Sequence, residues 1–188
     1  LKLLQSPAQE LKPVLVFIWA RIMSVDAANV RQELIRDNSF AYFIHILIPN
    51  TPDEIGIGTI NMSEHRAMCA FIIALFCRGF KLGQQKCMSS DIINACLTNM
   101  IDPENPLLRQ WSCLCLSQLW DLNVDGKWHA VKGNVFDELS ELLQDPIPEV
   151  RTSCIIALTT FLGVGDSKEV PEELREQEIK LAVNMLAL

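Results

Sequence analysis

The feature that most constrains the fold of this chain is a pattern that recurs about every 42 residues. A basic residue opens a strongly apolar stretch at Lys12, Arg66, Arg109 and Arg151, and the last two intervals are 43 and 42 positions. The first interval is 54 positions long. It contains residues 49–61, a stretch rich in Gly, Pro, Thr and Asn that we interpret as a loop insertion, and removing about a dozen residues restores the period. The chain is therefore expected to consist of stacked copies of one module.

Two of the copies begin with the same turn. Asp102-Pro103 precedes Arg109, and Asp145-Pro146, followed by Pro148, precedes Arg151. Asp accepts backbone N–H groups at a helix start and Pro suits the first helical position, so we expect these pairs to cap the apolar helices. We also expect each arginine to reach an aspartate of a neighbouring repeat, forming a ladder. The complete repeat motif is Lys12, Arg66, Asp102, Pro103, Arg109, Asp145, Pro146, Pro148 and Arg151.

Further apolar-periodic segments accompany the four basic-led helices, and strand patterns are nearly absent. These segments are Phe40 to Ile48, Ile92 to Ile101, Val135 to Leu143 and Ile179 to Leu188. Short connecting pieces such as Asp26 to Arg36 are candidates for a third helix in each unit. A period of 42–43 residues is typical of HEAT and armadillo units. The sequence therefore predicts an all-α fold, a HEAT/armadillo-type α-solenoid of about four repeats.

A column of small residues supports the stack. Eight residues after each basic residue stands Ala20, Ala74, Ser117 or Thr159, and a large apolar residue follows two positions later. Small side chains in this column would let neighbouring helices approach closely. We assign Trp19, Trp111 and Trp120 to the core columns as well.

The domain organisation expected from these patterns is one solenoid segment over residues 1–188, cut from a longer protein. Within it we expect the loop insertion at 49–61 and an acidic linker at 164–178. The segment Asp166 to Glu178 carries six acids against two bases and is interrupted by Pro171. This composition is typical of a solvated connection.

Charge and cysteine content limit the classes of function. The net charge of −7 and the pI near 5.0 argue against nucleic acid and against an anionic membrane surface as partners. The longest apolar run, Ala67 to Cys77, is much shorter than the roughly 18 residues of a membrane span, so we expect no membrane insertion. Seven cysteines without paired spacings favour a reducing compartment, here the cytoplasm.

Few residues offer catalytic or metal chemistry. His65 and Cys69 lie four positions apart, on one helical face, and are the only plausible base and thiol nucleophile. Cys113 and Cys115 point to different faces of a helix, so they do not make a zinc site with the three histidines of the chain. No glycine-rich phosphate loop occurs. We therefore expect no catalytic residues, no metal and no cofactor, with a thiol enzyme using His65 and Cys69 as the remote alternative.

One exposed-looking group is a candidate for partner binding. Lys127, Trp128 and His129 follow a turn-like stretch in the predicted connector 121–133, away from the apolar columns. Aromatic and cationic groups together are typical of interface anchors. A Trp that covers the end of its own repeat is the other interpretation.

Four segments together resemble the Raptor family, including its fungal Kog-type members. They are QELKPVLVFIWA at 9–20, SEHRAMCAFI at 63–72, NPLLRQW at 105–111 and DPIPEVR at 145–151. The last motif is generic to HEAT proteins, whereas the combination in this order is much more specific. The resemblance covers residues 1–163 and departs from the family at the 49–61 insertion and the 121–133 connector.

The resemblance implies a non-catalytic scaffold from the central helical-repeat region of a TOR complex subunit. In such proteins this region contributes to docking on the helical repeats of the TOR kinase, to binding small GTPases and to presenting kinase substrates. A cytoplasmic protein recruited through partners to the lysosomal or vacuolar surface is implied as well, with a caspase-like domain before the repeats and a β-propeller after them. Another HEAT or armadillo scaffold and a karyopherin-like transport receptor remain alternatives.

Overall fold

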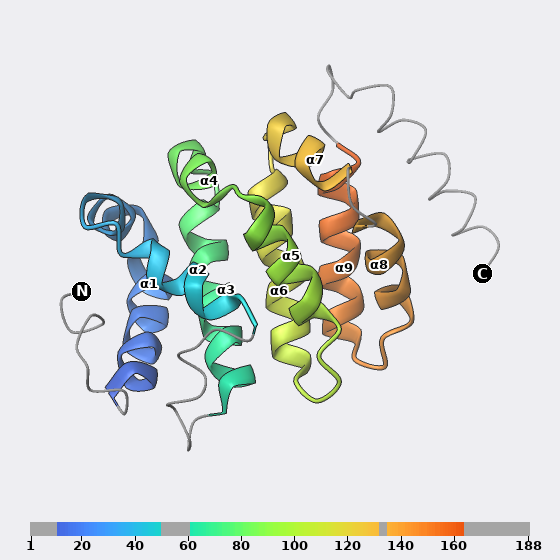
Figure 1. Ribbon diagram of the computed structural model, residues 1–188, viewed down its shortest axis with the longest axis horizontal. Helices are drawn as coiled ribbons and strands as arrows, with labels where there is room; N and C mark the ends of the chain where they lie inside the picture. The colour runs from blue at the N-terminus through green and yellow to red at the C-terminus, as the bar shows by residue number, and fades with distance from the viewer. Residues whose placement is uncertain (1–10, 50–60, 132–134, 164–188) are drawn as a thin grey trace.

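The computed structural model describes residues 11–49, 61–131 and 135–163, and every regular element in these ranges is helical (Figure 1). The elements are α1 (Lys12–Arg36), α2 (Phe40–Leu47), α3 (Met62–Cys77), α4 (Lys81–Cys87), α5 (Ser90–Met100), α6 (Pro106–Trp120), α7 (Val124–Val131), α8 (Val135–Glu141), the 3₁₀ turn η4 (Leu142–Gln144) and α9 (Pro148–Phe161). The predicted all-α solenoid is confirmed.

The helices group into units of one long and two short helices. The first unit is α1 and α2, the second is α3 to α5, and the third is α6 to α8 with η4; α9 begins a fourth. Helix α1 supplies two helices of its unit because its backbone leaves the helical region at Asp26, with φ −145° and ψ 61°. The Asp26 carboxylate accepts the side-chain N–H of Asn29 at 2.8 Å, just beyond this break. The short third helix expected in each unit is therefore present.

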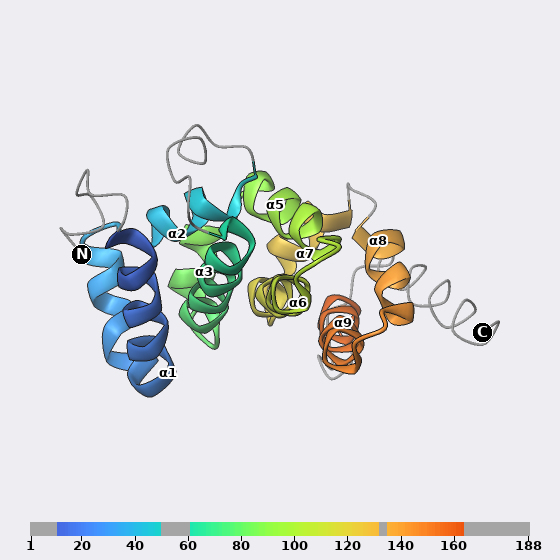
Figure 2. The ribbon, with the colours of Figure 1, turned by 90° about the horizontal axis from the view of Figure 1, so that it is seen from below.

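The helices form two rows. Figure 2 shows α1, α3, α6 and α9 side by side in one row, with α2, α5 and α8 in the other. The most extensive contacts join α3 to α6 and α6 to α9, and α1 packs on α3. The interior between the rows is apolar, and its largest fully buried side chains include Phe43, Phe76, Met100, Trp120 and Phe161. Burial of this continuous surface is what holds the units together.

The small-residue column lies where the long helices meet. Ala74 and Ser117 are buried at the α3 and α6 positions, and the large residues that follow, Phe76 and Leu119, are fully buried too. The ring of Trp120 lies 4.9 Å from that of Phe161 across the α6 and α9 contact. Of the three tryptophans assigned to the core, Trp120 is confirmed, whereas Trp19 and Trp111 are only half-buried at its edge.

The helix starts differ from the prediction. Helix α6 begins at Pro106 and its cap is Asn105, whose side-chain oxygen accepts the N–H of Leu107 at 3.0 Å. Helix α9 begins at Pro148, and its N-cap residue is Ile147. The expectation that Asp102-Pro103 and Asp145-Pro146 cap these helices is therefore wrong.

The aspartates fold the turn before each helix instead. Asp102 Oδ1 accepts the N–H groups of Glu104 at 2.9 Å and Asn105 at 2.7 Å, and Asp145 Oδ1 accepts the N–H of Ile147 at 2.8 Å. The short side chain of Asp readily accepts the backbone N–H group two residues later. In both repeats the aspartate makes this turn and does not cap the helix that follows.

The predicted ladder is present between Arg109 and Asp145. Arg109 Nε donates to Asp145 Oδ2 at 2.7 Å, and Arg109 Nη2 donates to Oδ1 at 3.1 Å. A third donor, Nη1, bonds the carbonyl oxygen of Asp102 at 2.9 Å. Both charged side chains are less than a tenth exposed. Burial alone would raise the pKa of Asp145, but the bonds from Arg109 and Ile147 outweigh it and hold the pKa below its usual value.

The ends of the ladder differ from its centre. Arg151 Nη1 donates to the carbonyl oxygens of Asp145 at 2.7 Å and Pro146 at 3.1 Å, so it braces the turn of its own repeat. The chain after α9, where an acid of the next repeat would come from, lies outside the described residues. Burial lowers the pKa of Arg66. The negative charge of Asp102 partly offsets this effect. Charges of alternating sign thus run from Arg66 to Arg151.

Some expectations fall outside the described ranges. They are the interior of the 49–61 insertion, the 164–178 linker, the segment 179–188 and the turn before Lys12. The described end of the insertion, Asn61, caps α3 by accepting the N–H of Ser63 at 3.1 Å.

Helix α1 is the one helix in the described part of the chain that is long and apolar enough, by length and composition, to cross a membrane. The structure gives another reason for this composition. One side of α1 packs on α3 and buries Val16, Ala20 and Met23. The other side exposes Val14, Phe17, Ile18 and Ile22. The packed side of α1 thus accounts for part of its apolar composition.

The buried ion pair should dominate the stability of the turn. Replacing Arg109 by Ala leaves the Asp145 carboxylate buried without its charged partner, and we expect the free energy of unfolding to fall by about 3–5 kcal/mol. The matched control is Arg36→Ala, which removes the exposed pair with Glu33 and should cost about 0.5 kcal/mol or less. Urea denaturation of both variants measures the difference, and equal losses would contradict a special role of the buried pair.

Candidate functional site

The predicted catalytic pair, His65 and Cys69, lies inside the protein. His65 is 1 % exposed and Cys69 is 0 % exposed, both on α3. Burial, followed by the charge of Lys12, lowers the pKa of His65 to about 4, and burial raises the pKa of the Cys69 thiol. Because the thiolate is the nucleophilic form of cysteine, this environment opposes the chemistry for which the pair was considered. The arrangement suits packing.

The imidazole of His65 is also unusual as a core group. Within the described ranges, neither Nδ1 nor Nε2 has a hydrogen-bond partner. A buried polar group without a partner costs about 1–3 kcal/mol. A second proton would place a charge on this buried imidazole, and the loss of stability would be larger than for the neutral form.

The remaining cysteines are core residues as well. All seven are free thiols and all are buried. The thiols of Cys77 and Cys87 are in contact, as are those of Cys96 and Cys115, and Cys154 Sγ donates to the carbonyl oxygen of Leu139 at 2.8 Å. In the described part of the chain, no three metal-ligating side chains converge on one point. These thiols act as small apolar side chains.

The predicted partner-binding group lies in a helix rather than in a connector. Residues 124–131 form α7, whose start is supported by the Asn123 side chain, which accepts the N–H of Gly126 at 3.3 Å. A Cβ at Gly126 would lie 2.8 Å from the side-chain nitrogen of Asn123 and 3.1 Å from the carbonyl oxygen of Leu119, so a larger residue would disturb this helix start. Lys127 is buried, so it is no exposed anchor. The side chains of Trp128 and His129 are not described, and their role in binding stays a prediction.

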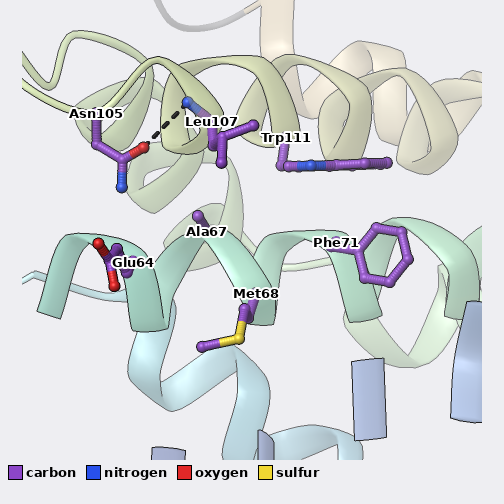
Figure 3. Close-up of a pocket in the computed structure, with 7 residues that line it drawn as sticks. All are labelled: Glu64, Ala67, Met68, Phe71, Asn105, Leu107 and Trp111. Atoms are coloured by element: carbon purple, nitrogen blue, oxygen red, sulfur yellow. Dashed lines mark hydrogen bonds between the residues drawn. The ribbon is translucent and has the colours of Figure 1, made fainter. Parts of the chain in front are cut away.

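The surface that sequence reasoning missed is a groove between α3 and α6. It has a volume of about 280 Å³ and is lined mainly by apolar side chains. Figure 3 shows the lining residues Glu64, Ala67, Met68 and Phe71 on α3, Leu107 and Trp111 on α6, and Asn105 just before α6. The rings of Phe71 and Trp111 meet edge to face, with centroids 4.6 Å apart, and Leu107 is 57 % exposed. The half-exposure of Trp111 follows from its place in this groove.

A second groove lies between α6 and α9, again with a volume of about 280 Å³. Its lining residues are Gln110 and Leu114 on α6 and Pro148, Glu149, Thr152, Ser153 and Ile156 on α9. Ile156 is 41 % exposed. Each groove has room for one or two side chains of another protein.

The burial of His65 makes a prediction about pH. The pKa of His65 is about 4 in the folded chain and near 6.5 in an exposed histidine. The unfolded chain therefore binds this proton first, and stability is lost as pH falls from about 6.5 to 4, by up to about 3 kcal/mol. His65→Leu should remove this loss, so the difference in unfolding free energy between variant and parent should change across that window. Denaturation at pH 7.5, 6 and 4.5 measures it, and parallel curves would contradict the assignment.

The burial of the cysteines makes a second prediction. Ellman's reagent should react slowly with the native chain and completely with all seven thiols after unfolding in urea. Gln32→Cys places a thiol at an exposed position of α1 and serves as the fast-reacting control. Rapid native modification at Cys69 would instead support the thiol nucleophile.

Comparisons with known proteins agree with this fold and specify it further. The HEAT repeat family model matches residues 135–164. The chain is 48 % identical over 187 residues to target of rapamycin complex 1 subunit mip1 of Schizosaccharomyces pombe, and 34 % identical over 189 residues to the protein raptor homolog of Dictyostelium discoideum. All of this chain is covered in both cases, but it spans only 14 % and 12 % of the two relatives.

The structural comparisons give the same picture. The crystal structure of Chaetomium thermophilum Raptor matches 99 % of this chain with a TM-score of 0.85 and 49 % identity, over 17 % of that protein's length. An engineered protein matches 95 % of this chain, and the chain covers 65 % of it, with a TM-score of 0.75 at 14 % identity, which is a likeness of fold alone. Sequence and structure together identify this chain as a Raptor-type segment of HEAT repeats.

Proposed function

We propose that this segment is a non-catalytic scaffold within a subunit of TOR complex 1. It would support docking of the subunit on the TOR kinase and the recruitment of small GTPases and kinase substrates in growth signalling. The observation that carries the proposal is the 48 % identity, over the whole chain, to a protein named as a subunit of that complex. A second relative, from Arabidopsis thaliana, is named regulatory-associated protein of TOR 1 and is 35 % identical.

The physical character of the segment supports a binding role. Its solenoid exposes apolar grooves between neighbouring long helices, and such extended surfaces bind protein partners through many shallow contacts. The one pair considered for catalysis, His65 and Cys69, is buried in a form that opposes nucleophilic chemistry. We therefore propose that the segment contributes surface and spacing to the complex, and no reaction.

The proposed location follows from the same assignment. A scaffold of this kind would act in the cytoplasm and reach the lysosomal or vacuolar surface through its partners. All seven cysteines are free thiols, which is the usual state in a reducing compartment.

A replacement experiment tests whether this segment binds or only separates its neighbours. In the full-length parent protein, the 188 residues are either deleted or exchanged for the matching part of the engineered solenoid, which keeps the fold at 14 % identity. Affinity purification then measures associated TOR kinase and small GTPases. We expect both changes to reduce association, because the exchange preserves shape but removes the binding surface.

The exchange is the decisive control. If association survives the exchange but not the deletion, the segment is a spacer, and the proposed binding role is wrong. If it survives both changes, the segment has no part in assembly. Expression level and solubility of the parent protein, measured alongside, identify any loss that comes from misfolding.

A further inference from the structure

The two grooves occupy equivalent positions in consecutive units. Counted from Arg66 on α3, Arg109 on α6 and Arg151 on α9, the side chains one, two and five positions later line them. The five-position column is Phe71, Leu114 and Ile156; the two-position column is Met68, Trp111 and Ser153. The grooves are therefore a repeated feature of one face of the row α3, α6 and α9.

The charges of this face have one sign. Glu64 lines the first groove and Glu149 the second, each two positions before the arginine of its helix. In the part of the chain that the structure describes, no basic side chain lines either groove. Among the described residues neither carboxylate forms an ion pair, and Arg151 is directed to the turn of its own repeat. A complementary partner must bring apolar side chains together with positive charge.

Several polar groups of the grooves are already engaged within the chain. Asn105 uses its side-chain oxygen to cap α6, Thr152 donates to the carbonyl oxygen of Pro148 at 2.9 Å, and Ser153 donates to that of Glu149 at 2.7 Å. An extended peptide would need such groups to bond its backbone. A helix satisfies its own backbone and needs only apolar and charged contacts.

The spacing of the grooves sets the spacing of the anchors. Neighbouring packed helices lie about 8–10 Å apart, so equivalent points in the two grooves are separated by about that distance. A rise of about 1.5 Å per residue places helical side chains seven residues apart at roughly 10 Å, on the same face. One helix laid across the row can therefore fill both grooves.

We propose that the α3/α6 and α6/α9 grooves form one docking surface for an amphipathic helix of a protein partner. The helix carries large apolar side chains seven residues apart and Lys or Arg beside them, opposite Glu64 and Glu149. This inference rests on the proposed scaffold function and names the chemistry of one partner.

A displayed library of 20-residue peptides, selected on the 188-residue chain, tests the proposal. We expect the selected peptides to be helical, with apolar residues seven apart and neighbouring basic residues. Leu107→Glu and Ile156→Glu should each weaken their binding at least about tenfold, measured by fluorescence anisotropy. The matched control is Ile101→Glu in the turn after α5, a residue that is 60 % exposed and lies outside both grooves. Circular dichroism of each variant verifies folding.

Charge reversal adds a test of specificity that loss of folding cannot imitate. A chain with Glu64→Lys and Glu149→Lys should release the basic peptides and bind versions of them in which the bases are replaced by Glu. Binders that prefer apolar residues three apart, that are insensitive to both groove variants, or that ignore the charge reversal would overturn the proposal, as would a selection without groove-dependent binders.

The two proposals can fail separately. If the exchange of the whole segment abolishes association with the TOR kinase while no groove-dependent peptide is found, the scaffold function stands and the docking surface is wrong. If peptides bind the grooves but the exchange leaves association intact, the surface is supported and the scaffold function is wrong.

Discussion

The stack depends on holding each long helix in a fixed register with the next, and the buried bond between Arg109 and Asp145 does this. Apolar contacts between helices are not directional, so they allow one helix to slide along another. A guanidinium held by two carboxylate oxygens and a carbonyl oxygen of the preceding turn allows one position only. The charge of Arg66 near Asp102 continues the arrangement in the previous unit. This register makes the surface columns of successive units line up.

The same register explains why the grooves lie where they do. In the second half of the long helices the shared column holds Ala74 and Ser117, and both are buried in close helix contacts. Earlier along the same two helices the contact is between Phe71 and Trp111, whose rings meet edge to face. Large rings hold two helices further apart than small side chains do, and the space beside them is open to solvent. The size of the side chains along one helix thus determines which part of it packs closely in the core and which part borders a groove.

The repeated features of this fold could be predicted from the sequence. The predictions were wrong where one side chain can form two different local structures. Arg109 and Asp145 could be paired in advance because the same residue types recur at one period. The role of Asp102 was wrong because a carboxylate before Pro can either cap a helix or fold the preceding turn, and the nearby Asn105 takes the cap. Helix α7 was missed because Asn123 and Gly126 are typical of turns, yet here they start and accommodate a helix. The grooves were missed because a groove belongs to two units, although the columns that line it could be aligned.

Burial explains why a segment with seven cysteines shows no catalytic arrangement among its described residues. His65 and the thiols lie where burial favours their neutral forms, so their ionisation is opposed by the same packing that holds the units together. The carboxylates and arginines of the ladder are committed to the turns. Among the described residues, the side chains that line the grooves are mainly apolar, and the charged ones are Glu64 and Glu149. Such a surface can discriminate between partners by shape and charge.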